Sequence, residues 1–530
     1  MTIIQSPRRQ TFYPCFRFIL ISIVALLILG GKKDAIYAAT VNLSAGGNLQ
    51  AAINNAKPGD TIILEAGATF SGPIILPYKA GSGTDSDFIT IQSSALDQLP
   101  QNVRVSPAQA NLMPKITAPG GNFPALRTEA AAHHYRFLGI EFVPATAEAM
   151  VTNLIELGDD GTRGQTSLER VPHHLVLDRC YIHAWAEQDV RRGIALNSAH
   201  TEVTNSYLSE FKSHSSDSQA ILGWNGPGPF RIINNYLEGA TENLQFGGGG
   251  GDPAIANLVP SDIEVRRNHL AKPLAWRGKW LVKNLLELKY ARRVVIEGNL
   301  LEYNWADGQA GYAIQLTVRN EGGRATWNTI EDVEITNNVV RHTSGGINIL
   351  GRDYNNPSQQ AKRIVIRNNL FAEMGSARWG GTDTFLQVTE TEGVVVDHNT
   401  VFQGGNIIEA YGVANTNFVF TNNIVPHNAY GIFGGGQSPG NKTIAVYFPR
   451  GVFKRNVIYG DFHEPEYGNY PPDNFYPDSL AEVGFAGFAT GNYRLSARSR
   501  YKGKATDGKD IGCDFDALSA ATAGVATSKP

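Results

Sequence analysis

A short phrase of alternating apolar and polar residues recurs down the chain, and each copy leads to a small polar residue followed by further apolar ones. Clear copies are Ile263–Leu270, Val294–Leu301 and Val333–Val340. The small polar position is occupied, in chain order, by Cys180, Ser206, Asn235, Asn268, Asn299, Asn338, Asn369, Asn399, Asn423 and Asn456. Successive positions lie 24 to 39 residues apart, so the phrase is constant while its spacing is not.

Period-two alternation indicates strands with one buried face. A constant phrase at variable spacing favours stacked coils that differ in loop length, because helical repeats and propeller blades keep a fixed period. An asparagine tolerates the left-handed backbone of a sharp corner, and stacked asparagines can bond each other's amides from coil to coil. The pattern therefore predicts an all-β, single-stranded parallel β-helix of about 12 coils that is stabilised by stacking.

Two segments have the character of ends. Leu49–Asn55 is a short amphipathic stretch before a turn, which predicts a helix capping the open first coil. Near the other end, a final strand at residues 493–496 precedes the turn Asp507-Gly-Lys-Asp. The β-helix domain is therefore expected to span residues 40–515, and the small, polar residues 516–530 are expected to form a flexible C-terminal tail.

The N-terminal segment has the pattern of an export signal. Arg8, Arg9 and Arg17 precede the 13-residue apolar run 18–30, which is shorter than the roughly 20 residues of a membrane span. We therefore expect residues 1–39 to be a signal peptide and the protein to be secreted or held in the cell envelope; the alternative is an uncleaved membrane anchor.

Composition narrows the class of protein. Hydrophobic residues make up 42% of the chain and charged residues 18%, which excludes an intrinsically disordered chain and predicts a large core. Removal of residues 1–39 takes away five positive charges and one negative, so the formal charge moves from −3 to −7. An acidic exported protein is a poor candidate for binding nucleic acid.

The strands that precede each phrase share a second pattern, in which two apolar residues flank one polar residue. Side chains alternate across a strand, so the apolar pair points inward and the polar residue outward. Stacking is therefore expected to build an outward column, a candidate substrate-binding surface that consists of Gln245, Glu287, Gln315, Asn348, Gln387 and Glu409. Amides and carboxylates bond sugar hydroxyls well, and the alternative is that these are ordinary solvated strand residues.

The segment 266–293 is strongly basic, with nine Lys or Arg and Glu287 as its single acid. Such a segment would attract an anionic polymer if its charges lay together, and would otherwise be a solvated loop.

The opening segment 49–77, the asparagine corners and the ending Asp507-Gly-Lys-Asp resemble the pectin-lyase-like superfamily over residues 40–515. This resemblance implies a right-handed parallel β-helix. It does not select an activity, because the superfamily includes lyases, hydrolases, epimerases and adhesins.

One coil is similar to the lysine-bearing coil of the family that contains chondroitinase B and alginate lyases. The segment Asn284-Leu-Leu-Glu-Leu-Lys289 carries this similarity, which implies Lys289 as a catalytic base and calcium as the one cofactor to consider. The family's next-coil arginine is replaced here by Thr317, and its acidic calcium ligands by Val282 and Asn284.

From the residues alone, a uronic-acid lyase needs a base and a cation that neutralises the substrate carboxylate. Lys289 is the candidate base: crowding by Arg292, Arg293 or Arg319 would lower its pKa, and Glu287 beside it would oppose that shift. Arg319 or Arg352 is the candidate clamp for the carboxylate.

The sequence thus predicts an exported, monomeric, carbohydrate-active protein whose partner is a polysaccharide, anionic in the favoured interpretation. A lyase that works by β-elimination is the first hypothesis. A glycoside hydrolase or epimerase in the same groove is the second, and a non-catalytic glycan-binding or surface protein is the third.

Overall fold

The computed structural model describes residues 38–81, 83–462 and 469–526. The predicted signal peptide lies, apart from its last two residues, outside the described residues. Within the described residues, no helix is both long and apolar enough to cross a membrane.

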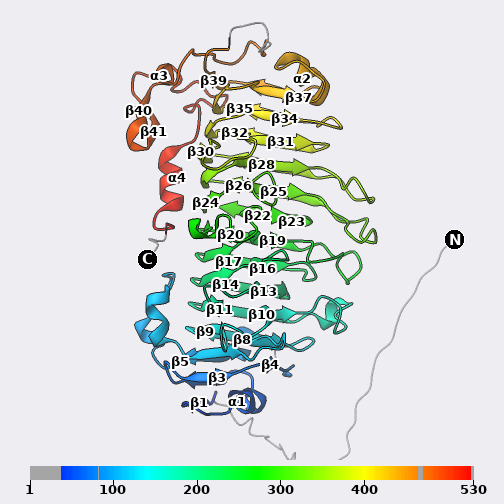
Figure 1. Cartoon of the computed structure of the whole chain (residues 1–530), viewed down its shortest axis with the longest axis vertical. Helices are drawn as coiled ribbons and strands as arrows, with labels where there is room; N and C mark the ends of the chain where they lie inside the picture. Colours follow the sequence, from blue (N-terminus) through cyan, green and yellow to red (C-terminus); the bar gives the residue numbers. More distant parts are fainter. Residues whose placement is uncertain (1–37, 82, 463–468, 527–530) are drawn as a thin grey trace, which may run out of the picture. The chain divides into compact units, whose positions relative to one another are not determined.

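Three long parallel sheets run the length of the stack, and each complete coil contributes one strand to each sheet (Figure 1). Sheet A has 14 strands, from β1 (Thr40–Leu43) to β38 (Val452–Lys454), and sheet B has 13, from β3 (Thr69–Ser71) to β39 (Val457–Tyr459). The 12 strands of sheet C are β4 (Ile74–Leu76), β7 (Leu126–Thr128), β10 (Val151–Gly158), β13 (Val190–Asn197), β16 (Gln219–Gly223), β19 (Glu242–Phe246), β22 (Leu286–Leu288), β25 (Tyr312–Thr317), β28 (Gly345–Leu350), β31 (Leu386–Thr389), β34 (Ile408–Ala410) and β37 (Ile432–Gly434). The predicted right-handed parallel β-helix of about a dozen coils is confirmed.

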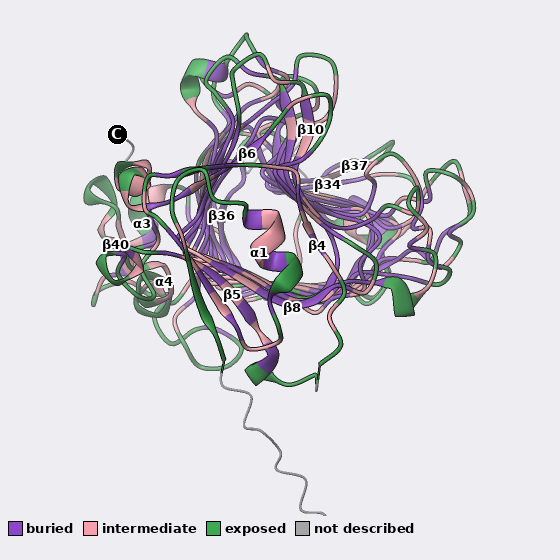
Figure 2. Cartoon of the chain, turned by 90° about the horizontal axis from the view of Figure 1, so that it is seen from below, coloured by how far each residue is buried: buried purple, intermediate pink, exposed green. Residues whose placement is uncertain are grey.

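The interior of the stack is filled by the apolar positions of the three sheets. On sheet C, for example, Leu244, Leu286 and Ile314 pair in register on neighbouring strands and are buried in one continuous core. The first coil is closed by α1 (Leu49–Asn55), whose Leu49 and Ile53 join that core; Figure 2 shows α1 in the open end of the stack. The predicted capping helix is confirmed.

The asparagines form a hydrogen-bonded ladder at the corner between sheets A and B. In each rung the side-chain oxygen of one asparagine accepts from the backbone N–H and the side-chain amide of the asparagine one coil earlier. Asn268 thus donates to Asn299 Oδ1 over 2.8 and 3.1 Å, and Asn299 donates to Asn338 Oδ1 over 2.9 Å. The same contacts continue to Asn474, one rung beyond the last asparagine that the phrase identifies.

One detail of this corner differs from the expectation. The left-handed residue is the one that precedes each ladder asparagine, such as Arg267 (φ 55°), Asn337 (φ 57°) or Asn368 (φ 54°). The ladder asparagine itself is needed for its amide, which bonds the next coil, and not for its tolerance of positive φ.

The corner between sheets C and A has a ladder of its own, which the repeated phrase does not reveal. Its left-handed residues alternate in charge over four coils: Asp262, Arg293, Asp332 and Arg363, with φ between 53° and 58°. Arg293 forms a bidentate pair with Asp262 at 2.6 and 2.7 Å, and Arg363 does the same with Asp332. The coils of Asp262 and Arg293 are thereby joined on the outside, and so are the coils of Asp332 and Arg363.

The C-terminal segment also differs from the expected flexible tail. Residues Phe515–Thr522 form α4, which lies beside the stack in Figure 1. Leu518 packs on Leu370 and Ala372 of sheet B, and Arg267 Nη1 donates to the carbonyl of Ala521 at 2.6 Å. The segment is anchored because its few apolar side chains meet the outside of the coils, a contact that its small, polar composition does not predict.

The ladder leads to a first prediction. In Asn299→Ala the backbone N–H and the side-chain amide of Asn268 lose their shared acceptor, and the carbonyl of Val265 loses its donor. Since each buried group left unpaired costs about 1–3 kcal/mol, we expect the free energy of unfolding to fall by about 3 kcal/mol, measured by guanidinium titration followed by circular dichroism.

Asn299→Ser is the matched control, because Ser206 already fills a rung and its hydroxyl accepts from the N–H of Cys180 at 2.9 Å. We expect a clearly smaller loss from the serine. Equal losses from the two variants would show that the ladder bonds are not what stabilises this corner.

Candidate functional site

The six predicted column residues do stand in one register on sheet C. Gln245 pairs with Glu287, Glu287 with Gln315, Gln315 with Asn348, Asn348 with Gln387, and Gln387 with Glu409. The apolar neighbours of each residue belong to the core, so the column faces away from it. The placement of the column is as predicted, whereas its role in binding a substrate stays a prediction.

The column is not the open groove that the sequence suggested. Gln245, Glu287 and Gln315 are only 3%, 4% and 7% exposed, whereas Asn348, Gln387 and Glu409 are half-buried. The glycine segment 247–251 supplies part of the cover over Gln245, whose Nε2 donates to the carbonyl of Gly247 at 2.9 Å. The end of the column at Gln245 is therefore covered by the segment that follows its own strand.

A second outward column runs beside the first, three residues earlier on each strand. Asn153, Arg192, Gln219 and Glu242 pair in register on β10, β13, β16 and β19. Arg192 donates to Asn153 at 3.2 Å and to Gln219 at 3.3 Å, and Gln219 donates to Glu242 Oε2 at 2.7 Å. Gln219 also donates to Gln245 at 3.3 Å, which links the two columns.

This second column cannot be found in the sequence by assuming that side chains alternate strictly along each strand. At the corner that opens sheet C two consecutive residues face the core, as Leu285 and Leu286 or Phe385 and Leu386 do. The residue before such a pair therefore points outward, although a strict period of two would place it inside.

Glu242 is the most perturbed carboxyl group of the two columns. It is 1% exposed, and its Oε2 accepts from the hydroxyl of Thr241 at 2.7 Å. Burial, together with the negative charges of Glu287 and Asp217, raises the pKa of Glu242 to about 7. Glu242 can therefore exchange a proton near neutral pH, which is the property of a general acid or base.

Lys289 lies next to these carboxyl groups, with its Nζ 2.7 Å from Glu321 Oε1. Burial acts to lower the pKa of Lys289, but Glu287, Glu321 and Glu242 outweigh it and hold the pKa above its ordinary value. The expected lowering by arginines is wrong. Arg292 and Arg293 bond Ser261 and Asp262 at the edge of sheet A instead. Lys289 is therefore an ammonium ion at neutral pH.

The two candidate clamps are each held by an acid. The backbone N–H of Arg319 donates to the carbonyl of Lys289 at 3.0 Å, so the two residues are neighbours, but the Arg319 guanidinium lies 4.0 Å from Asp353. Arg352 lies 3.2 Å from Glu390 and lines a cleft of about 310 Å³ together with Arg292. Arg319 is thus close to Lys289, and Arg352 faces a different part of the surface.

The basic segment 266–293 does not form one patch. A single coil passes through all three sheets, so residues close in sequence end on different sides of the stack. Arg266 pairs with Glu264 on sheet A, Lys283 with Asp217 beside sheet C, and Lys272 is buried, where its Nζ bonds the carbonyl of Gly239.

Calcium does not fit the coil that carries Lys289. The ion takes six to eight oxygen ligands, whereas the side chain of Val282 offers none and the Lys289 ammonium lies beside the carboxylates. Over the described part of the chain, the one group of three His, Cys, Asp or Glu side chains whose ligand atoms lie close together is made of histidines on sheet A.

Those histidines lie beside a cleft that the sequence did not predict. The cleft has a volume of about 1030 Å³ on the outward face of sheet A, and its lining includes Arg136, His174, His200, Glu202 and Arg231. Burial and the neighbouring imidazoles lower the pKa of His173 and of His174 to about 4. These rings are therefore neutral at physiological pH.

No family model and no curated protein matches the chain. Similar solved structures include an alginate lyase from Paenibacillus (16% identity, 71% of this chain and 93% of that one, TM-score 0.30). Others are a mannuronic-acid-specific family 6 lyase from human gut microbiota (11%, 86% and 93%, 0.45) and the α-1,3-glucanase of Streptomyces thermodiastaticus (12%, 79% and 68%, 0.48). At these identities the likeness concerns the fold alone, which the strand pairing already establishes.

The cover over the column leads to a second prediction. Gly248 has φ +85°, and a Cβ there would lie 2.8 Å from Gln245 Nε2 and 2.9 Å from Lys289 Cδ. An alanine at this position costs about 1–2 kcal/mol of backbone strain and pushes the segment 247–251 away from Gln245 and Lys289. We therefore expect the amide hydrogens of residues 247–251 to exchange about tenfold faster.

Gly251→Ala is the control, since no atom lies within 4 Å of a Cβ at that position. Hydrogen exchange followed by mass spectrometry compares the two. Unchanged exchange in Gly248→Ala would mean that the glycine segment does not rest on Gln245 and Lys289.

Proposed function

We propose that this protein is a carbohydrate-active enzyme that binds a polysaccharide along the outward face of sheet C and cleaves it beside Glu242, Glu287 and Lys289. The observation that carries the proposal is the buried acid–base cluster itself. The fold does not require charge at these positions, because Ala195 and Leu222 fill the column of Glu287 in two other coils. Burying several charged groups is costly, so a cluster that the fold does not need points to chemistry.

A polymer with hydroxyl groups suits the column. The column extends over six consecutive coils, and its residues are spaced by about 4.8 Å from coil to coil, close to the length of one sugar unit. Asn284 Oδ1 and Asn348 Oδ1 are buried atoms for which the described residues supply no hydrogen-bond donor. Hydroxyl groups of a bound glycan would satisfy both oxygens.

The favoured reaction is β-elimination on an acidic polysaccharide. In that reaction a base removes the proton next to the uronic carboxylate, and a cation neutralises the carboxylate. The raised pKa of Lys289 suits it to the cation role in place of the base, once the substrate carboxylate replaces Glu321. Glu242, with a pKa of about 7, is then the candidate base.

Hydrolysis is the second candidate, and the pairing of Glu242 with Glu287 favours it. Two carboxyl groups of which one is protonated and one ionised are the acid and base of a glycosidase. Burial and the charge of Glu287 keep Glu242 protonated below pH 7, as the acid of such a pair must be.

A third prediction separates these reactions. The full chain is incubated with pectate, alginate and a glycosaminoglycan, and unsaturated ends are followed near 235 nm together with total reducing ends. If Glu242 is the base of a lyase it must be ionised, so activity rises as the pH increases through about 7. If it is the acid of a hydrolase it must be protonated, so activity falls over the same range and no absorbance develops.

In either case Glu242→Gln is expected to lower kcat by at least about 100-fold, because a positioned acid or base contributes that much. Exposed Glu148 provides the matched control, and Glu148→Gln is expected to retain full activity. Binding of a glycan without any cleavage would reject the enzymatic proposal and favour a glycan-binding protein.

Export is a further part of the proposal and rests on the N-terminal pattern alone. Recovery of the protein outside the cytoplasm with a new N-terminus near residue 40 would support a cleaved signal. Recovery in the membrane fraction with the original N-terminus would support an anchor.

A further inference from the structure

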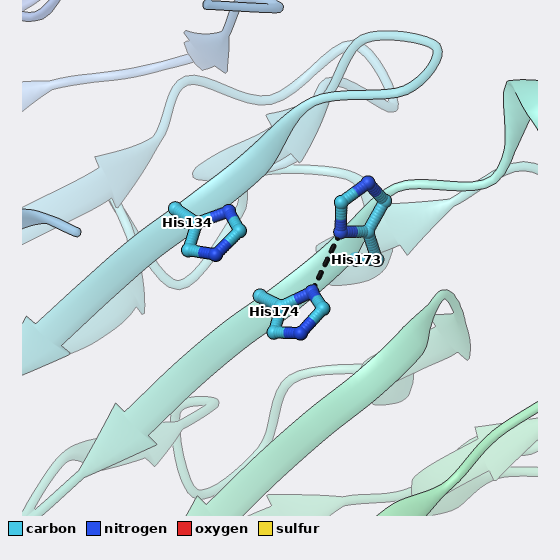
Figure 3. Close-up of side chains that lie close together, drawn as sticks. All are labelled: His134, His173 and His174. Atoms are coloured by element: carbon cyan, nitrogen blue, oxygen red, sulfur yellow. Dashed lines mark hydrogen bonds between the residues drawn. The ribbon is translucent and has the colours of Figure 1, made fainter. Parts of the chain in front are cut away.

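Two histidine doublets face outward on adjacent strands of sheet A. His133-His134 begins β8 (His133–Leu138), and His173-His174 begins β11 (His173–Asp178). The doublets stack ring on ring across the two coils: His133 lies on His173 with centroids 4.9 Å apart, and His134 on His174 at 4.5 Å. Figure 3 shows the His134 ring beside those of His173 and His174, with the contact between His173 and His174 drawn as a dashed line.

The corner between sheets C and A explains why neighbouring residues turn to the same side. His134 (φ 57°) and His174 (φ 53°) occupy the left-handed positions that Asp262 and Arg293 occupy farther along the stack. The turn folds each of these side chains back onto the residue before it. Within each doublet the two Nδ1 atoms are therefore only 2.7 Å apart.

Three of these rings converge on one small volume. One ring nitrogen each from His134, His173 and His174 lies within 4.8 Å of the other two. His134 is 2% exposed, and its Nε2 is a buried atom for which the described residues provide no hydrogen-bond partner. A buried nitrogen without a partner, next to two further imidazoles, is an unsatisfied ligand atom.

We propose that His134, His173 and His174 form a binding site for a divalent transition-metal ion of the zinc, copper, nickel or cobalt type. Imidazole nitrogens suit these ions, whereas calcium and magnesium prefer oxygen ligands. A tetrahedral ion with bonds of 2.0–2.1 Å holds its ligand nitrogens about 3.4 Å apart, whereas the nitrogens of this group lie up to 4.8 Å apart. The rings must therefore shift by roughly 1 Å, and an Nδ1 atom that binds the ion must leave its 2.7 Å contact within the doublet.

The surroundings fit a site with three protein ligands. His133 bonds His134 and stacks on His173, so it holds both rings in place. His174 also lines the cleft of about 1030 Å³, which leaves a fourth position of the ion free for water or a small ligand from that side. The site joins two successive coils, and bound metal would therefore stabilise their stacking.

The site does not depend on the proposed function. It lies on sheet A, whereas Glu242, Glu287 and Lys289 belong to the outward face of sheet C. Loss of metal binding and loss of polysaccharide cleavage can therefore be measured separately.

A fourth prediction tests the site on the full chain purified without a polyhistidine tag. Titration with Co²⁺ is followed by visible absorption, and titration with Zn²⁺ by calorimetry. We expect one equivalent to bind, with the visible bands of cobalt in a nitrogen-rich, four-coordinate site. His173→Gln and His174→Asn are each expected to weaken binding by at least tenfold, and Zn²⁺ is expected to raise the Tm of the unmodified protein but not of these variants.

His200→Asn is the matched control. His200 stacks on His174 at 4.5 Å and has the same left-handed backbone (φ 45°), but it lies outside the three-histidine group. We expect this variant to bind metal as the unmodified protein does.

The proposal is overturned if the unmodified chain binds no stoichiometric metal, or if His173→Gln and His174→Asn bind it as tightly as His200→Asn. Circular dichroism establishes that each variant is folded. Asparagine is used at position 174 because it tolerates positive φ, and His173→Gln avoids that position altogether.

Discussion

The structure depends on one constraint: each coil must pair with its neighbours in a single register on all three sheets at once. Backbone hydrogen bonds between parallel strands define the register, but they would tolerate a slip of two residues, which returns every side chain to the same face. The asparagine ladder does not tolerate such a slip, because each asparagine amide bonds a backbone group and the next asparagine at the buried corner between sheets A and B. Every outward column of this protein, structural or functional, exists because that register holds over many coils.

The corners, more than the strands, decide which side chains meet on the surface. At the corner that opens sheet C two successive residues, here Asn243 and Leu244, are buried, and the residue before them is turned outward; this is how Glu242 comes near Glu287. At the corner between sheets C and A a left-handed residue folds back on its predecessor, and this is how His173 and His174 come within 2.7 Å. Both candidate sites thus arise where regular alternation breaks down, which is where strain and chemistry tend to occur in other folds.

Charge is used in two different ways on the same scaffold. The ladder of Asp262, Arg293, Asp332 and Arg363 is self-neutralising, and its members are half exposed, so it joins coils at little cost. In the cluster of sheet C, by contrast, Glu242 and Glu287 repel each other in a buried setting, and one of them retains a proton near neutral pH. The first arrangement stabilises a fold, whereas the second maintains reactive groups in a defined state.

The repeat, the stack of parallel coils, the capping helix and the register of the column from Gln245 to Glu409 could be predicted from the sequence, because they follow from a local period and from residues that recur once per coil. The folded chain was needed to show that the glycine segment covers Gln245, that Lys289 lies among carboxylates, that the basic segment is dispersed, and that α4 packs on sheet B. The doublets His133-His134 and His173-His174 can be read from the sequence. The 40 residues between them include a loop whose length follows no rule, so the sequence does not show that the doublets lie on adjacent strands. The physical reason is common to all of these cases: a repeat specifies position along a coil, whereas contacts between loops, and the charge around a buried group, depend on distances that no local pattern encodes.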